Sequence, residues 1–481
     1  MKKKYLILVN SADMMAKYHL ALGSELEKSG NEVKFAFVDR QPLYRENLSV
    51  PDEKVHYFSD YFKANFENPK PVPEIYKDLN INKIYFSDYD RIHIYAGVKM
   101  YDSGYYDSLM KNLINFFHDI QKENNFNVCI YESVSNSFAY AAFEVLRRND
   151  VQYCGYAGCR LKDRFELYTE EFGSLELFKK TFENTSLEEM PQEDLDYVDE
   201  YLSQYKNTGS IPSYHPKKTH LDWNYSILKR YFNFNKFRIV KGVLRYTIKE
   251  YKDLKYCYQS RNPVGEIVNG IKMQILRQFR LRAGKKYFDT INIEEDFFLY
   301  PQHFKPESST SVLARHYCND VDNITKIAFN LPFGTKLYVK EHFVNFGRLP
   351  LSYYKALKNI PNVKLISPDE NTKNLIQKAK GIITLTSTVG FEALMMSKPV
   401  FVFGNVFYHI HPNCRKLNGF ENLDRELRNL EVVEDSEINR RFIAAYKNTS
   451  YPGNVYYSLS DNFEVDKFAK PFIAAMNVRF S

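Results

Sequence analysis

Short apolar runs alternate with segments of helical spacing in two separate parts of the chain, and this alternation restricts the possible folds more than any other feature. The run Tyr5–Val9 is followed by leucines at helical spacing that end before Gly30, and the same order returns at Phe126–Tyr131. Such runs are typical of parallel strands buried on both faces. Four more runs lie in the second half, at Lys336–Lys340, Val363–Ile366, Gly381–Thr386 and Pro399–Phe403. The alternation predicts an α/β protein with two Rossmann-like domains.

The 481 residues are enough for about three domains at ~150 residues each. We expect one long helix over Asp102–Lys122 and an acidic helical stretch over residues 174–206. We predict a first Rossmann-like domain at residues 1–206 and a second one at residues 291–435. A basic helical insert at residues 207–290 would separate them, and a helical segment at residues 436–481 would pack back across the domains.

Composition excludes several classes of protein. With 44% hydrophobic and 26% charged residues, the chain is neither intrinsically disordered nor collagen-like. Its six cysteines form no CxxC pair, which argues against a disulfide framework and a structural zinc site. Met1–Val9 lacks the apolar core of a signal peptide, and no window approaches the ~20 apolar residues of a membrane span. We expect a soluble cytoplasmic protein, at most peripheral at the inner face of the cytoplasmic membrane.

Residues 217–286 carry the excess positive charge. They hold 18 Lys/Arg against 4 Asp/Glu, whereas the whole chain has a net charge of only +7. Apolar residues interleave with these cations, as in an amphipathic helix that lies on an anionic lipid surface. A nucleic-acid surface would look similar, but we expect no nucleic-acid partner. A helical block whose cations face water, or face the acidic stretch 183–200, explains the pattern equally well.

The segment around Ser387 is the most specific in the sequence. A predicted strand ends at Thr386, and Ser387, Thr388, Val389 and Gly390 then form a turn of small residues into a helix. Backbone N–H groups and hydroxyls at a positive helix N-terminus suit a phosphate. Glu392, which we place in the first helical turn, would reach a ribose diol. A plain turn capped by Ser or Thr remains the alternative.

Two further stretches follow predicted strands. The strand at Lys336–Lys340 ends in Lys340, Glu341 and His342, and ligands of open α/β sheets bind beyond the carboxyl ends of strands. Lys340 and His342 would bind the phosphate of a leaving group, unless the histidine is structural. The stretch Leu299–Ser311 presents His303 and Lys305 before a capped helix start. It is either another phosphate or sugar contact or a domain-boundary loop.

These three stretches, in this order, resemble the capsule polysaccharide biosynthesis family, which includes β-Kdo transferases. The family shows a "P-x-H-x-x-P-E" stretch, a "K-x-H-P" strand end and an "S-x-x-G-F-E-A-L-x-x-x-K-P-V" segment. The matching positions here are Pro301, His303, Pro306 and Glu307, then Lys340 and His342, then Ser387, Gly390, Phe391, Glu392, Ala393, Leu394, Lys398, Pro399 and Val400. The resemblance covers roughly residues 297–412. Phe343 stands where the family usually has Pro, which puts the turn after His342 in question.

The resemblance implies the two-domain glycosyltransferase B fold (GT-B), in which the C-terminal domain holds most of the nucleotide sugar and the N-terminal domain holds the acceptor. It also implies transfer of a sugar to a capsule or surface polysaccharide, with a glycan or glycolipid acceptor. A CMP-activated acidic sugar such as Kdo is the favoured donor, with a UDP-sugar as the alternative. Neither a metal nor a cofactor is expected, because helix dipoles and basic side chains stabilise the leaving phosphate.

Sugar transfer needs a base for the acceptor hydroxyl or a nucleophilic carboxylate. Glu132 and Asp13 are the candidates, because both follow predicted N-terminal strands, and His303 would lie at the same cleft. Burial at a strand end would raise the pKa of Glu132. Asp13 has the alternative role of a helix cap. Asp102 and His19 are weaker candidates.

Two other functions remain open at this stage. A nucleotide-sugar 2-epimerase or hydrolase would share the two-domain fold and a similar turn, and would act on the donor without an acceptor. A non-catalytic scaffold of the capsule-assembly machinery would keep the fold without the reaction.

Overall fold

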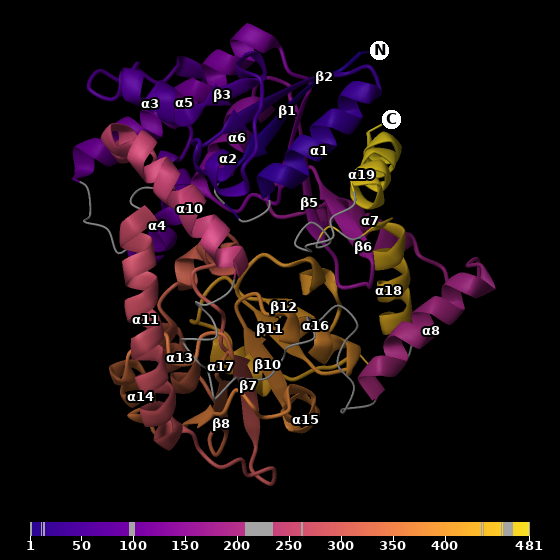
Figure 1. Ribbon diagram of the computed structural model, residues 1–481. Helices are drawn as coiled ribbons and strands as arrows, with labels where there is room; N and C mark the ends of the chain where they lie inside the picture. Colours follow the sequence, from indigo (N-terminus) through magenta and orange to yellow (C-terminus); the bar gives the residue numbers. More distant parts are fainter. Residues whose placement is uncertain are drawn as a thin grey trace. The chain divides into compact units, whose positions relative to one another are not determined.

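The computed structural model describes residues 2–10, 12, 15–95, 102–206, 234–260, 263–433, 435, 437–453, 455 and 465–480. The chain forms two compact units, each built around one sheet (Figure 1). Unit 1 contains Met1–Ser174, Ser226–Ile271 and Ser450–Ser481, and unit 2 contains Leu175–Tyr225 and Lys272–Thr449.

Unit 1 holds a seven-stranded sheet in the order β13-β6-β5-β4-β1-β2-β3. The strands are β1 (Lys4–Val9), β2 (Glu32–Phe37), β3 (Val55–Tyr57), β4 (Val128–Glu132), β5 (Gln152–Gly158), β6 (Arg164–Tyr168) and β13 (Tyr451–Pro452). Strands β1 to β5 all pair in parallel, in the order β5-β4-β1-β2-β3, while β6 and β13 are added antiparallel at the β5 edge. The helices are α1 (Met15–Lys28), α2 (Gln41–Glu46), α3 (Phe58–Asn65), α4 (Ile81–Tyr95), α5 (Ser103–Asn124), α6 (Ser137–Arg147), α10 (Phe234–Lys249) and α19 (Val465–Arg479).

Helices cover both faces of this sheet, which explains why its strands read as continuous apolar runs. Successive side chains of a strand point to opposite faces. Leu6 and Leu8 of β1 therefore pack in one core with α5 and α6, whereas Ile7 and Val9 pack in another core with α1 and α19.

Unit 2 holds a six-stranded, wholly parallel sheet in the order β12-β11-β10-β7-β8-β9. The strands are β7 (Phe297–Pro301), β8 (Lys336–Lys340), β9 (Val363–Ile366), β10 (Gly381–Thr384), β11 (Val400–Val402) and β12 (Cys414–Lys416). The helices are α7 (Leu175–Asn184), α8 (Gln192–Lys206), α12 (Ser308–Ser311), α13 (Asp320–Phe329), α14 (Leu351–Lys358), α15 (Thr372–Lys378), α16 (Thr388–Met395), α17 (Leu423–Arg428) and α18 (Ile438–Asn448). Because β7 lies between β8 and β10, the carboxyl ends of these three strands are neighbours.

The two predicted Rossmann-like sheets are confirmed, but the units divide at other residues than the expected 206, 290 and 435. Helices α7 and α8 belong to unit 2, where Asp199 of α8 pairs with Arg440 of α18. The last segment is shared, because α18 belongs to unit 2, while β13 and α19 complete unit 1. Position along the chain does not show which core the apolar face of a helix will join.

Within the basic segment 217–286, the structure describes α10, a turn at Tyr251–Tyr256, and α11 (Pro263–Gly284), which begins in unit 1 and ends in unit 2. Residues 217–233 lie outside the described residues. No helix among the described residues is both long and apolar enough to cross a membrane.

Candidate active site

Three loops of unit 2 begin at the neighbouring carboxyl ends of β7, β8 and β10. The loop after β7 carries His303, β8 ends in Lys340 and continues to His342, and the turn after β10 leads through Ser387 into α16. Loops at this edge of an open parallel sheet are where α/β proteins bind ligands. Parallel pairing thus brings the predicted donor-site residues to one edge of unit 2.

The turn from β10 into α16 is held by two hydroxyl groups. The Ser387 hydroxyl accepts a hydrogen bond from the Val389 backbone N–H at 3.2 Å and caps the helix. The Thr384 hydroxyl in turn accepts one from the Ser387 N–H at 3.1 Å. Ser387 and Thr388 are both half-buried, so their side chains remain partly accessible. Ser387 therefore caps the helix, as the alternative interpretation expected. The capped N-terminus carries a partial positive charge, which also suits an anion.

Gly390 has a structural reason to lack a side chain. A Cβ at this position would lie 2.7 Å from the hydroxyl oxygen of Tyr408, which donates a hydrogen bond to the Ser387 carbonyl at 2.5 Å. Tyr408 is buried, and it therefore braces the turn through a contact that only glycine permits. Tyr408 was not among the predicted site residues, because nothing in the spacing of residues 390 and 408 indicates that they touch.

We expect Gly390→Ala to destabilise the protein by about 1–3 kcal/mol, since the added methyl must displace the Tyr408 ring or the turn. Urea unfolding of the variant measures this loss. Gly419→Ala is the matched control, because nothing lies within 4 Å of a Cβ there, and it should change stability by less than about 0.5 kcal/mol. Equal midpoints for Gly390→Ala and the wild type would contradict the bracing role.

His303 is buried and fastens the loop after β7 to the same turn. Its Nε2 accepts a hydrogen bond from the Thr386 N–H at 3.0 Å and lies 3.4 Å from the Thr384 hydroxyl. Burial lowers the pKa of His303 to about 3, so the ring is neutral and carries its proton on Nδ1. This geometry makes His303 a positioning residue for the turn.

The strand end at β8 presents one cation and one neutral histidine. Burial lowers the pKa of Lys340 to about 8, and its ammonium donates to the Pro368 carbonyl at 3.0 Å. Burial, with Lys340 and Arg348 nearby, lowers the pKa of His342 to about 4. His342 Nδ1 accepts from the Val344 N–H at 3.3 Å, so the proton is on Nε2. At neutral pH the strand end therefore offers a charged ammonium and an imidazole N–H donor.

The turn after His342 forms without the proline of the family pattern. The Asn345 and Phe346 N–H groups donate to the His342 carbonyl at 2.9 and 3.1 Å, and the Phe343 ring stacks on His342. Glu341, for which no role was predicted, is buried, and its carboxylate accepts from the His342 N–H at 2.8 Å. Burial raises the pKa of Glu341 to about 7.

The prediction that Glu392 lies in the first turn of its helix is wrong. Helix α16 begins at Thr388 and has no acidic residue in its first turn, so Glu392 lies one turn further in. Its side chain is buried, and its negative charge favours the charged forms of Lys340 and Lys373. The structure thus brings Glu392 within electrostatic range of Lys340. The position of the helix start, set by the Ser387 cap, accounts for the shift.

In unit 1, Glu132 is the last residue of β4. Its carboxylate accepts a hydrogen bond from the Ser135 hydroxyl at 2.9 Å. Burial raises its pKa, and Ser135 and the positive charge of Arg91 oppose that rise. Asp13, the other candidate carboxylate, lies outside the described residues.

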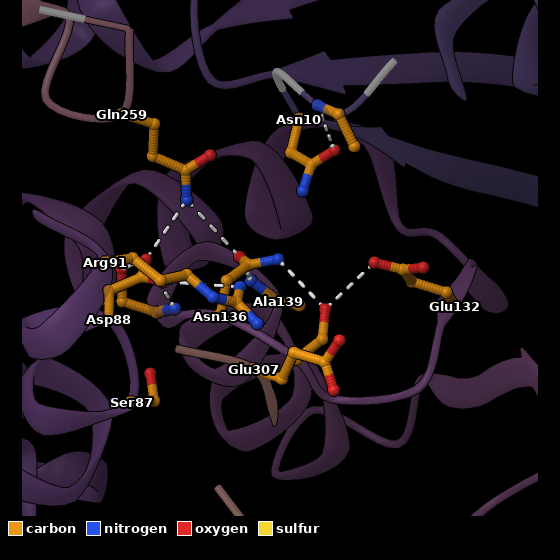
Figure 2. Close-up of polar contacts among 12 residues, drawn as sticks. Asn10, Ser87, Asp88, Arg91, Glu132, Asn136, Ala139, Gln259 and Glu307 are labelled. Atoms are coloured by element: carbon orange, nitrogen blue, oxygen red, sulfur yellow. Dashed lines mark hydrogen bonds and ion pairs between the residues drawn. The ribbon is translucent and has the colours of Figure 1, made fainter. Parts of the chain in front are cut away.

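A network of buried polar side chains supports the loop after Glu132 (Figure 2). Asn136 caps α6 by accepting from the Ala139 N–H at 3.0 Å. Asp88 of α4 accepts from both the N–H and the hydroxyl of Ser137, at 3.0 and 2.7 Å. Gln259 donates to Asp88 at 3.2 Å and to Asn136 at 3.4 Å. Nothing in the sequence predicted this network, since its members lie far apart along the chain.

The two weaker candidates have structural roles. Asp102 caps α5 by accepting from the Tyr105 N–H at 2.9 Å. His19 is fully buried on α1, where its Nε2 lies 2.8 Å from the Tyr156 hydroxyl and burial lowers its pKa to about 3. No group of three or more His, Cys, Asp or Glu side chains in the described part of the chain is placed to hold a metal ion.

Comparison with known proteins confirms the resemblance drawn from the three motifs. The family model for "capsule polysaccharide biosynthesis protein" matches residues 258–418. This segment contains the loops after β7, β8 and β10, and it is about a third of the chain. Protein FixF of Sinorhizobium fredii (strain NBRC 101917 / NGR234) is 26% identical over 207 residues, which are 41% of this chain and 50% of FixF. The chain therefore spans about half the length of this curated relative.

Among solved structures, the chain is similar to Thermosulfurimonas dismutans KpsC, a beta Kdo 2,4 transferase. It is 16% identical, with a TM-score of 0.38, over 70% of this chain and 84% of that chain. UDP-GlcNAc 2-epimerase from Neisseria meningitidis bound to UDP-GlcNAc is 13% identical, with a TM-score of 0.28, over 99% of both chains.

Proposed function

We propose that the protein is a GT-B glycosyltransferase that moves a sugar from a nucleotide-sugar donor to a growing bacterial capsule or surface polysaccharide. One observation carries the proposal. Lys340, His342 and the Ser387-capped start of α16 lie at neighbouring strand ends, inside the segment that matches the capsule polysaccharide biosynthesis family. Such an arrangement offers several hydrogen-bond donors and one positive charge to a phosphate.

The leaving nucleotide is the group that this edge would stabilise. When the bond between sugar and phosphate breaks, negative charge grows on the phosphate oxygens. The Lys340 ammonium, the Nε2–H of His342 and the N-terminus of α16 would meet that charge, and the hydroxyls of Ser387 and Thr388 would contact other oxygens. His303 acts indirectly, because it holds the Thr386 backbone that leads into the turn. We propose that no bound metal takes part, so that transfer should persist in EDTA.

Two carboxylates have proposed roles, Glu392 in donor binding and Glu132 in the chemical step. Glu392 would bind the ribose of the donor near Lys340. Glu132 would act in unit 1 as the base for the acceptor hydroxyl or as the nucleophile, with Asp13 as the alternative carboxylate. Burial is the property that fits Glu132 for proton transfer, because it raises the pKa of the carboxyl above its usual value.

A CMP-activated acidic sugar such as Kdo is the donor we favour, with a glycan or glycolipid acceptor at the inner face of the cytoplasmic membrane. Thermal-shift measurements with CMP, UDP, GDP and TDP test the nucleotide. We expect CMP to raise the melting temperature most, since ligands that bind only the folded state stabilise it. A larger shift with UDP would assign the same phosphate site to a UDP-sugar. If no nucleotide raised the melting temperature, the donor site could not lie at the carboxyl ends of β7, β8 and β10.

Donor consumption separates transfer from the alternative activities. A transferase needs the acceptor, whereas an epimerase or hydrolase would convert the donor alone. Acceptor-dependent turnover would exclude a non-catalytic scaffold.

Nucleotide binding should weaken with rising pH, because Lys340 titrates near pH 8. The phosphate of CMP, with a second pKa near 6, is fully charged above pH 7.5. From pH 7.5 to 9.5 the charged fraction of Lys340 falls about 25-fold, and the affinity for CMP should fall by about tenfold or more. Calorimetric titration across this range measures the effect.

Two variants assign this pH dependence to one side chain. Lys340→Met should bind CMP more weakly at pH 7.5 and lose the dependence. Lys378→Met, which removes an exposed lysine of α15 in the same unit, should keep it. A wild-type pH profile in Lys340→Met would show that another group binds the phosphate.

A further inference from the structure

Helix α10 has a charge composition unlike an ordinary surface helix. Its 16 residues contain five cations and no acidic residue; the cations are Lys236, Arg238, Lys241, Arg245 and Lys249. Surface helices usually mix both signs, because neighbouring opposite charges stabilise a helix and like charges at i,i+4 spacing destabilise it. The one-sided charge therefore needs an explanation other than helix stability.

One face of α10 is anchored to the rest of unit 1. Gly242 lies so close to the Tyr44 carbonyl, just before the end of α2, that a Cβ would come within 2.6 Å of its oxygen. Val243 and Tyr246 are buried on the same side. This packing fixes which way the helix faces and leaves its other side outward.

The outward side carries an aliphatic stripe, and a cationic row lies between this stripe and the face anchored to α2, where the Lys249 ammonium is 5.7 Å from the centre of the Tyr44 ring. Val240, Leu244 and Ile248 follow each other at four-residue spacing, with exposed fractions of 39%, 45% and 77%. The residue after each of them is an exposed cation, so that Lys241, Arg245 and Lys249 form a second row. Residues four apart share one face of a helix, and a shift of one residue turns each row by about 100°. The two rows are therefore adjacent along the helix.

We propose that this face of α10 docks on an anionic lipid bilayer. An interfacial helix buries an aliphatic stripe at the boundary of headgroups and acyl chains, and it places cations beside the phosphates. The absence of acidic residues from α10 removes the repulsion that such a surface would otherwise exert. A second amphipathic helix, α11, also exposes apolar residues at helical spacing, at Val264, Val268, Ile271, Ile275 and Phe279. Single-stranded nucleic acid fits this face of α10 less well, because base stacking needs aromatic side chains, whereas the exposed row of Val240, Leu244 and Ile248 is aliphatic.

Sedimentation with vesicles tests the proposal. We expect the full chain to bind vesicles of phosphatidylglycerol and phosphatidylcholine, and to bind pure phosphatidylcholine at least tenfold more weakly. Salt should weaken the binding, because attraction to the surface decays over a Debye length of ~8 Å at physiological ionic strength. Vesicle binding needs neither donor nor acceptor, so its outcome is independent of the proposed transfer reaction.

Two sets of variants measure separately how much the cationic row and the aliphatic row contribute to vesicle binding. Reversal of Lys241, Arg245 and Lys249 to Glu should weaken binding to anionic vesicles by about a hundredfold. Replacement of Leu244 and Ile248 by Gln should weaken it at least tenfold without any change of charge. As a control of equal charge change, Lys122, Lys355 and Lys378, exposed on α5, α14 and α15, are reversed to Glu and should have little effect. Circular dichroism checks that each variant is folded.

Every result bears on the proposal. Equal binding to neutral and anionic vesicles, binding to neither, or wild-type binding by a folded α10 variant would overturn it. Tighter binding to an oligonucleotide than to anionic vesicles would assign the cationic row to nucleic acid and would also overturn it.

Discussion

Replacing Glu132 by Gln is expected to abolish sugar transfer while leaving donor binding unchanged. Glutamine keeps the size of the side chain and the oxygen that accepts from the Ser135 hydroxyl, so the loop after β4 should keep its shape. It can neither take a proton from the acceptor nor attack the sugar. Loss of a general base typically reduces the rate by about 10²–10⁴-fold, and loss of a nucleophile reduces it further.

Steady-state kinetics of Glu132→Gln measure this loss, and nucleotide titration shows whether the donor still binds. Glu123→Gln, at an exposed position of α5 in the same unit, is the control and should turn over normally. Normal turnover by Glu132→Gln together with an inactive Asp13→Asn would move the catalytic role to Asp13.

A second large effect, a loss of donor binding, is expected when His342 of unit 2 is replaced. His342→Ala should weaken donor binding about ten- to a hundredfold, because a hydrogen bond to a charged phosphate contributes about 1.5–3 kcal/mol. The fold should survive, since His342 is half-buried and its one described side-chain hydrogen bond goes to the backbone of its own turn. His342→Gln, which keeps an N–H donor, should recover part of the affinity.

Glu392→Ala should reduce donor binding by a similar factor, but through two effects. It removes the proposed ribose contact, and it removes the negative charge that favours the protonated form of Lys373 and one of the four negative charges that favour that of Lys340. Glu392→Gln separates the two effects, because the amide keeps a hydrogen-bonding group but not the charge. Wild-type nucleotide affinity in folded His342→Ala and Glu392→Ala would exclude both residues from the donor site.

The central strands of the two sheets could be predicted closely from the sequence, whereas β3, β6, β12 and β13 were not predicted. Lys336–Lys340 and Val363–Ile366 are the strands β8 and β9 of the structure, and the helix predicted over Asp102–Lys122 is α5. Each depends on a local pattern, either a continuous apolar run or amphipathic spacing, that holds wherever the segment packs. The parallel pairing of the strands also follows from the α/β pattern, but the position of β7 between β8 and β10 was not predicted.

The contacts that hold the candidate site residues in place could not be predicted, because they join residues that are distant in sequence. The close approach of Tyr408 to Gly390 joins positions 18 residues apart, and Asp88 reaches Ser137 and Gln259 from another helix. The type of a residue also does not decide its role in the site. The sequence offered His303 as a catalytic or phosphate contact, whereas burial and the bond to Thr386 N–H give it a positioning role.

The central claim is that the protein transfers a sugar from a nucleotide donor to an acceptor. The most direct measurement is release of CMP from CMP-Kdo by the full chain, with and without a Kdo-terminated or glycolipid acceptor, and with UDP-sugars as parallel donors. We predict release that requires the acceptor and a glycan product longer by one sugar. Conversion of the donor at the same rate without acceptor, or no release from any donor by folded protein that binds nucleotide, would contradict the account.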